Sequence, residues 1–108
     1  MERGNIETNL PDASTGEIIE TLSAMPGRNV RIERIVSGGQ FSPPGFWYDQ
    51  GWDEWTLVLR GKAVIRFREP PGTEILEQGD WLRIPAHREH RVESTTADTL
   101  WLAVHAGG

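Results

Sequence analysis

The sequence predicts an all-β protein, a sandwich or barrel of seven or eight short strands. From residue 29 onward, apolar and polar residues alternate with a period of two, as expected for strands with one buried face. The 12 glycines and 7 prolines are spread along the chain and mark a turn about every ten residues. No long segment shows the 3.6-residue period of a helix.

Residues 1–28 form an N-terminal arm whose structure the sequence leaves open. Ser14 and Glu17 have the spacing of a helix capping box, and residues 18–22 carry apolar side chains that could share one helical face. The same run is short and β-branched, which equally favours a strand. The arm therefore contains either a short helix or a strand.

Residues 29–108 carry the strands of the predicted barrel. The segment 54–60 is apolar enough on both faces to be buried, and the tight turn at Gly61 and Lys62 predicts a hairpin with the segment 63–68. The other strands are predicted at 29–36, 73–77, 81–84, 90–93 and 99–105. Periodicity alone leaves an immunoglobulin-like sandwich, a lipocalin-like barrel and a jelly roll open.

The composition is that of one soluble globular domain, residues 1–108. Hydrophobic residues make up 37 % and charged residues 25 %. The absence of cysteine excludes disulfides, zinc–thiolate sites and thiol catalysis. A net charge of −5 without a basic run argues against nucleic-acid and membrane partners. Because no segment approaches the ~20 apolar residues of a membrane span and no signal peptide opens the chain, we expect a cytoplasmic protein.

Two groups of residues decide between the architectures. Glu54 is followed by six residues and Gly61, and Gly79 is followed by five residues, Pro85 and then His90. These spacings resemble the two motifs of the cupin superfamily, G-x5-H-x-H-x3/4-E-x6-G and G-x5-P-x-G-x2-H. The resemblance covers about residues 40–93 and implies a jelly-roll barrel, the double-stranded β-helix.

The chain departs from this pattern where the family carries its paired histidines. Those positions fall at Tyr48 and Gln50, or, with the alternative spacing, at Trp47 and Asp49. The segment after Gln50 matches the shorter spacing better, so we favour Tyr48 and Gln50 as the pair that faces the lumen. The last glycine position of the second motif is held by His87.

The resemblance implies that Glu54 and His90 point into the barrel. With Gln50 they would hold a divalent metal ion, iron, manganese, nickel or zinc. Two other interpretations stay open: a metal-free acid–base pair, and a buried structural hydrogen bond. Tyr48 or Asp49 is the candidate for catalytic proton transfer, and Trp47 is the candidate wall of a ligand or cofactor pocket.

Two histidines and three tryptophans are assigned to the outside of the barrel. His87 is predicted at the surface and His105 on the outer face near the C-terminus. Parity puts Trp55, Trp81 and Trp101 on the outer faces of the sheets. Exposed aromatic residues on a small protein usually mark a subunit interface, so we expect a homodimer.

Two classes of function follow for this barrel. One is a metal-dependent enzyme of lyase, isomerase or oxygenase type that acts on a polar small molecule. The other is a protein without catalysis, either a ligand-binding module or a structural dimer with a metal-free pocket. The fold class does not choose between them.

Overall fold

A computed structural model describes residues 1–107, which form two antiparallel β-sheets facing each other. One sheet has the strand order β1-β2-β8-β3-β6 and the other the order β5-β4-β7. The strands are β1 Ile18–Met25, β2 Val30–Ser37, β3 Asp53–Arg60, β4 Lys62–Phe67, β5 Gly72–Glu77, β6 Trp81–Ile84, β7 His90–Thr95 and β8 Thr99–Ala106. The predicted all-β jelly roll is confirmed. Among the described residues, no helix is long and apolar enough to cross a membrane.

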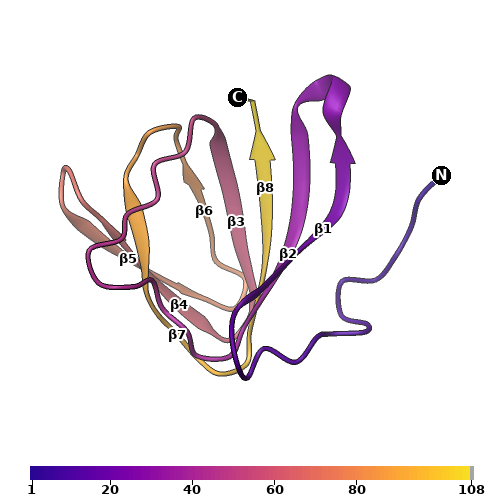
Figure 1. The fold of residues 1–108 in the computed structure, drawn as a ribbon, viewed down its shortest axis with the longest axis horizontal. Helices are drawn as coiled ribbons and strands as arrows, with labels where there is room; N and C mark the ends of the chain where they lie inside the picture. Colours follow the sequence, from indigo (N-terminus) through magenta and orange to yellow (C-terminus); the bar gives the residue numbers. More distant parts are fainter. Residues whose placement is uncertain (108) are drawn as a thin grey trace.

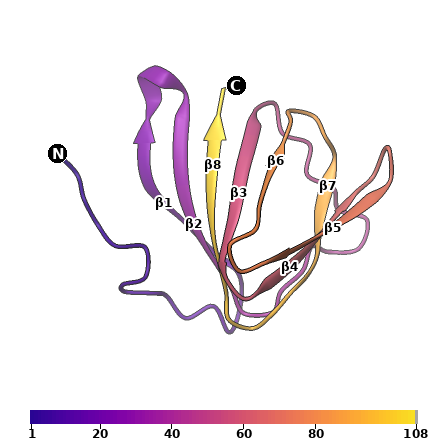
Figure 2. The same cartoon turned by 180° about the vertical axis from the view of Figure 1, so that it is seen from behind.

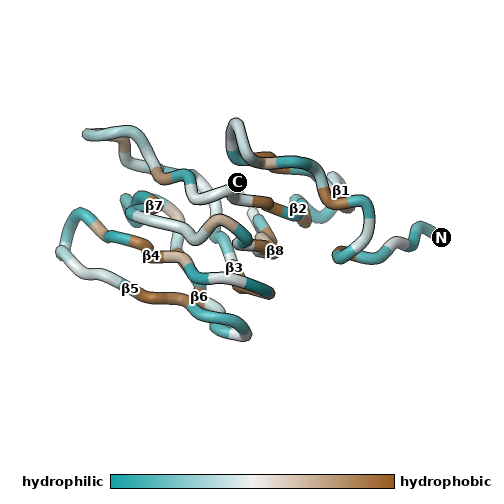
Figure 3. Tube along the Cα trace, turned by 90° about the horizontal axis from the view of Figure 1, so that it is seen from below, coloured by the Kyte–Doolittle hydropathy of each residue, from teal (hydrophilic) through white to brown (hydrophobic). Residues whose placement is uncertain are grey.

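The strands converge at one end of the barrel and spread apart at the other (Figure 1, Figure 2). Between the sheets lies a hydrophobic core. It consists of Val58, Ala63, Ile65, Phe67, Leu76, Ile84 and Trp101. Seen from below, hydrophobic positions mark β2, β4, β5 and β8, whereas the arm before β1 is mostly hydrophilic (Figure 3). The core side chains fill part of the space between the two sheets, and the polar groups described below lie beside them.

The N-terminal segment that could have been a helix is a strand. β1 pairs with β2 along its whole length, with one irregularity between Thr21 and Ser23. Glu17 does not cap a helix; its carboxylate accepts a hydrogen bond of 2.9 Å from the Ser37 hydroxyl. The β-branched pair Ile18 and Ile19 suits a strand. Pairing with β2 gives the backbone N–H and C=O groups hydrogen-bond partners, whereas an isolated short helix is only marginally stable.

Trp101 and His105 are buried, and the prediction that they lie on the outer face is wrong. β8 is the central strand of its sheet, between β2 and β3. Trp101 is 4 % exposed and His105 is 8 % exposed, with Ala103 buried between them on the same face. For Trp55 and Trp81 the predicted outer position holds: their rings lie 5.8 Å apart and Trp81 is 60 % exposed. The homodimer stays a prediction.

Arg34 ties the segment before β1 to the barrel. Its buried guanidinium donates to the Glu20 carboxylate at 2.8 Å and to the backbone carbonyls of Ile6, Thr8 and Asn9. One side chain therefore fixes a stretch of chain that has few other contacts with the sheets.

Replacing Arg34 by alanine is expected to lower the free energy of unfolding by about 1–3 kcal/mol, because the change removes a buried guanidinium and its hydrogen bonds to Glu20 and to the N-terminal arm. Urea denaturation measures the loss, and limited proteolysis shows whether the arm has come free. Arg66→Ala on β4, an exposed arginine, is the control. Equal stability and equal cleavage in the two variants would show that Arg34 does not hold the arm.

Candidate functional site

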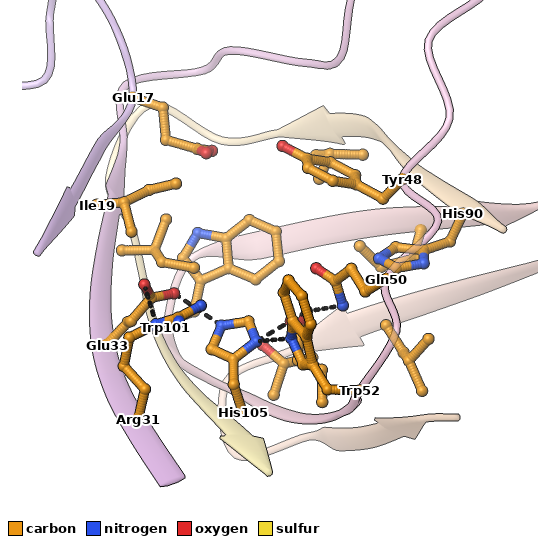
Figure 4. Close-up of a pocket in the computed structure, with 16 residues that line it drawn as sticks. Glu17, Ile19, Arg31, Glu33, Tyr48, Gln50, Trp52, His90, Trp101 and His105 are labelled. Atoms are coloured by element: carbon orange, nitrogen blue, oxygen red, sulfur yellow. Dashed lines mark hydrogen bonds and ion pairs between the residues drawn. The ribbon is translucent and has the colours of Figure 1, made fainter. Parts of the chain in front are cut away.

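A cavity of about 220 Å³ lies between the two sheets. Figure 4 shows its lining, in which polar side chains from both sheets point into a space with apolar and aromatic walls. The polar members are Glu17, Arg31, Glu33, Tyr48, Gln50, Glu54, Thr56, His90 and His105. The apolar members are Ile19, Ile35, Trp52, Ile65, Ile84, Val92 and Trp101.

Of the two alternatives for residues 47–50, the structure adopts the one with Tyr48 and Gln50 in the lumen. Tyr48 pairs with His90 of β7 through two backbone hydrogen bonds, of 2.7 and 3.1 Å, which fixes the side that each residue faces. Trp47 does not line the cavity; its ring lies 5.8 Å from the Arg68 guanidinium. Asp49 also lies outside the lining.

The Asp49 carboxylate instead pairs with His87, whose Nδ1 lies 2.8 Å away at an exposed position. The neighbouring backbone is tied as well, since the His87 amide donates to the Gln50 carbonyl at 2.6 Å. His87 is thus a surface residue, as predicted. The backbone hydrogen bond, which does not depend on the side chain at position 87, holds the loop that carries Gln50 against the loop before β7.

Glu54 reaches the lumen from β3, where the predicted alternation with Thr56 and Val58 holds. Its side chain is 12 % exposed. The Gln50 amide nitrogen donates to Glu54 Oε1 at 3.0 Å. No hydrogen bond joins Glu54 to His90 in residues 1–107, so the two residues face the lumen separately.

His90 presents one nitrogen to the lumen. The residue is 5 % exposed and its ring stacks on Tyr48 at a centroid distance of 5.4 Å. His90 Nδ1 lies 2.9 Å from the Arg88 carbonyl oxygen, which can only accept, so Nδ1 carries the hydrogen. In the part of the chain that the structure describes, Nε2 has no hydrogen-bond partner. It is a free acceptor at the wall of the cavity.

His105 is one of several lumen residues that the sequence analysis missed, with Glu17, Glu33, Trp52 and Trp101. Its Nε2 lies 2.7 Å from Glu33 Oε1, and its Nδ1 accepts a 2.7 Å hydrogen bond from the Trp52 indole N–H. Because an indole only donates, Nδ1 is unprotonated and Nε2 carries the hydrogen. Its spacing from Trp101 on β8 was visible in the sequence. The face was not, because Leu100 and Leu102 make the other side of β8 apolar too.

Electrostatics keeps the Tyr48 hydroxyl protonated. Burial, and then the negative charges of Glu17 and Glu54, raise the pKa of Tyr48. Burial also raises the pKa of Glu17, against the opposing effect of the hydrogen bond from Ser37. Tyr48 is therefore a hydrogen-bond donor toward a molecule in the lumen at neutral pH.

The predicted metal ligands are inadequate for a resident ion as they are arranged. His90 supplies one free imidazole nitrogen and Glu54 one carboxylate, whose Oε1 already accepts from the Gln50 amide. His105 has both ring nitrogens engaged. Across residues 1–107, no group of three His, Asp or Glu side chains is placed to hold a metal. Protein sites for zinc or non-haem iron supply about three such ligands, so the donor set does not fit.

We therefore expect purified protein to contain far less than one transition-metal ion per chain when measured by elemental mass spectrometry, even after expression in metal-supplemented medium. The Glu54→Ala/His90→Ala double variant serves as the reference for unspecific metal. Near-stoichiometric metal in the wild type that is lost in this variant would contradict the conclusion drawn from the donor set.

Comparison with known proteins agrees with the fold. A candidate mannose-6-phosphate isomerase from Ralstonia eutropha JMP134 is 41 % identical over 100 % of both chains, with a TM-score of 0.90. An RmlC-like cupin protein from Desulfovibrio desulfuricans is 17 % identical, with 98 % of this chain and 96 % of that chain covered and a TM-score of 0.78. KdgF from Halomonas sp. is 16 % identical, with coverages of 94 % and 90 % and a TM-score of 0.73.

No protein-family model matches the chain, and no curated protein does. The full-length identity to the Ralstonia protein, the two facing sheets and the cupin fold of the structural neighbours lead to one assignment. The chain belongs to the cupin superfamily.

Proposed function

We propose that the protein is a small isomerase-type enzyme that binds a polar molecule in the lumen and moves a proton on it. One observation carries the proposal, the His90 Nε2 described above. His90 is 5 % exposed, its Nδ1 is held by the Arg88 carbonyl, and its unprotonated Nε2 opens onto the cavity, so this nitrogen is free to accept a hydrogen bond or a proton from a molecule bound there. The cavity is smaller than the ~300–1,000 Å³ of sites for drug-sized ligands, which favours a small metabolite.

Two side chains of the lumen have complementary chemistry for an isomerisation between neighbouring carbons. His90 Nε2 removes a proton from the carbon beside a carbonyl and returns it to the carbonyl carbon. Tyr48 gives its hydroxyl proton to the carbonyl oxygen, where negative charge develops, and takes one back from the neighbouring hydroxyl. The proton transfers balance, because His90 and Tyr48 both regain their starting protonation states. Glu54 and Gln50 orient the molecule through hydrogen bonds.

The comparisons support the reaction class. The Ralstonia protein of 41 % identity bears the name of a candidate sugar-phosphate isomerase, and isomerisation of a sugar proceeds by such a proton transfer. A chain without activity that only binds a ligand is the alternative. It predicts occupancy of the lumen without chemical change.

Proton exchange tests the proposal directly. The protein is incubated in D2O with a panel of small hydroxyaldehydes, hydroxyketones and their amino derivatives, and proton NMR follows the carbon-bound hydrogens. We expect at least one compound to exchange a hydrogen for deuterium at a rate proportional to protein concentration. If compounds bind and none exchanges, the protein is a ligand-binding module and not an isomerase.

A further inference from the structure

The lining of the cavity holds three carboxylates, those of Glu17, Glu33 and Glu54. Among the lining residues that the structure describes, Arg31 is the only cationic one. The Arg31 Nε lies 3.0 Å from Glu33 Oε2, so these two charges compensate each other. The Arg31 side chain is also 43 % exposed. Glu17 and Glu54 are left without a cation.

The partners of these two carboxylates are neutral. Glu17 accepts from the Ser37 hydroxyl at 2.9 Å, and Glu54 accepts from the Gln50 amide at 3.0 Å. His105 Nδ1 lies 3.9 Å from Glu54 Oε1, but this nitrogen already accepts an indole N–H and carries no proton. The lumen therefore has a negative potential that no side chain of the lining cancels. Tyr48 responds to it, because Glu17 and Glu54 are two of the causes that raise the pKa of its hydroxyl.

Three aromatic rings form part of the apolar surface, beside the aliphatic side chains named above. Tyr48, Trp52 and Trp101 all line the cavity, and the faces of aromatic rings attract positive charge. The Arg31 guanidinium lies 5.8 Å from the Trp52 ring centroid, and one face of Tyr48 stacks on His90, so Trp101 and the other face of Tyr48 are the surfaces left for a ligand. The Trp101 indole N–H donates to Ser37 Oγ at 3.0 Å, so it is not available to a ligand. In Figure 4 the Glu17 carboxylate and the Tyr48 hydroxyl point toward each other, with the Trp101 ring below them in this view. His90 Nε2 faces the same space as a free acceptor.

Building on the proposed function, we infer that the molecule bound in the lumen is a small organic cation that carries an ammonium group. Its positive charge offsets Glu17 and Glu54, its N–H or N–CH₃ groups contact the rings of Trp101 and Tyr48, and an N–H donates to His90. A phosphorylated sugar has the opposite character. It would bring a charge of about −1.5 to −2 into a lumen whose single cation is already paired. The substrate class therefore differs from that in the name of the Ralstonia relative.

Matched probes separate charge from shape. Isothermal titration calorimetry on the full chain compares choline with 3,3-dimethylbutan-1-ol, which has the same shape without the charge, and mannose 6-phosphate with mannose. Ethanolamine and tetramethylammonium extend the cation set. We expect choline to bind about tenfold or more tightly than its neutral analogue, and mannose 6-phosphate to bind more weakly than mannose.

Variants place the effect in the lumen. Glu17→Gln and Glu54→Gln keep the side-chain volume and are each expected to weaken choline binding by about tenfold, with little change for the neutral analogue. Glu74→Gln on β5, an exposed glutamate, is the control and should leave choline binding unchanged. Thermal unfolding of each variant shows that the fold is kept.

Three results would overturn the inference: choline and its neutral analogue bind equally, mannose 6-phosphate binds more tightly than mannose, or none of the three cations binds. Each is separate from the fate of the proposed function. Charge preference without proton exchange would leave a cation-binding module, whereas exchange on neutral sugars without charge preference would leave an isomerase of a different substrate class.

Discussion

Replacing His90 by glutamine should slow proton exchange on the active compound by about 10²–10⁴-fold, the range that positioned acid–base groups contribute. Glutamine nearly fills the same space and can still form a hydrogen bond to the Arg88 carbonyl, but it offers no basic nitrogen. The loss should appear in the rate at saturating substrate, with a smaller change in affinity, because the proton transfer takes place after binding. Deuterium incorporation followed by NMR measures both.

His87→Gln is the matched control for this experiment. It changes the same residue type three positions away, at a side chain that is 72 % exposed and lies outside the cavity lining. Its rate should stay close to that of the wild type. If His90→Gln exchanges as fast as His87→Gln while its thermal unfolding is unchanged, His90 is not the base and its free nitrogen serves binding alone.

The largest effect on stability is expected at Trp101. Trp101→Ala should lower the free energy of unfolding by about 3–5 kcal/mol, because the change removes a large side chain from the core cluster and leaves a cavity. It also leaves the buried Ser37 hydroxyl without the donor that now lies 3.0 Å away. Urea denaturation followed by circular dichroism measures the difference.

Comparing Trp81→Ala with Trp101→Ala tests whether the loss of stability comes from the burial of Trp101. The same side chain is removed from a position that is 60 % exposed, so the expected loss is within about 1 kcal/mol. Similar losses at the two sites would mean that Trp101 is not part of the core in solution. A barrel that survives without Trp101 would also be expected to bind larger molecules, since the ring forms part of the cavity wall.

The sequence predicts the barrel well because its signals are local. Alternation and turn residues mark seven of the eight strands, and the spacing around Glu54 and His90 identifies the family and two residues of the lumen. The choice of Tyr48 and Gln50 over their neighbours also agrees with the structure. In an extended segment every second side chain faces the same side, so the spacing to Glu54 was enough to make this choice. The short first strand stayed ambiguous, because its apolar residues fit either period.

Features that depend on long-range packing were beyond the sequence. The face of β8 could not be assigned, because a central strand is apolar on both sides and Trp101 and His105 fit either one. The third carboxylate of the lumen, that of Glu33, pairs with His105, which lies far from it along the chain. The predicted metal came from family positions, whereas the engagement of Glu54 Oε1 and of both His105 nitrogens became visible only in the structure.

The two imidazoles of the lumen stand on opposite sheets, His90 on β7 and His105 on β8, and only His90 has a free nitrogen. A molecule held between the sheets is therefore open to a base on one side only. A proton that His90 removes returns from that same side. The reaction should be suprafacial, and a new stereocentre in the product should have a single configuration.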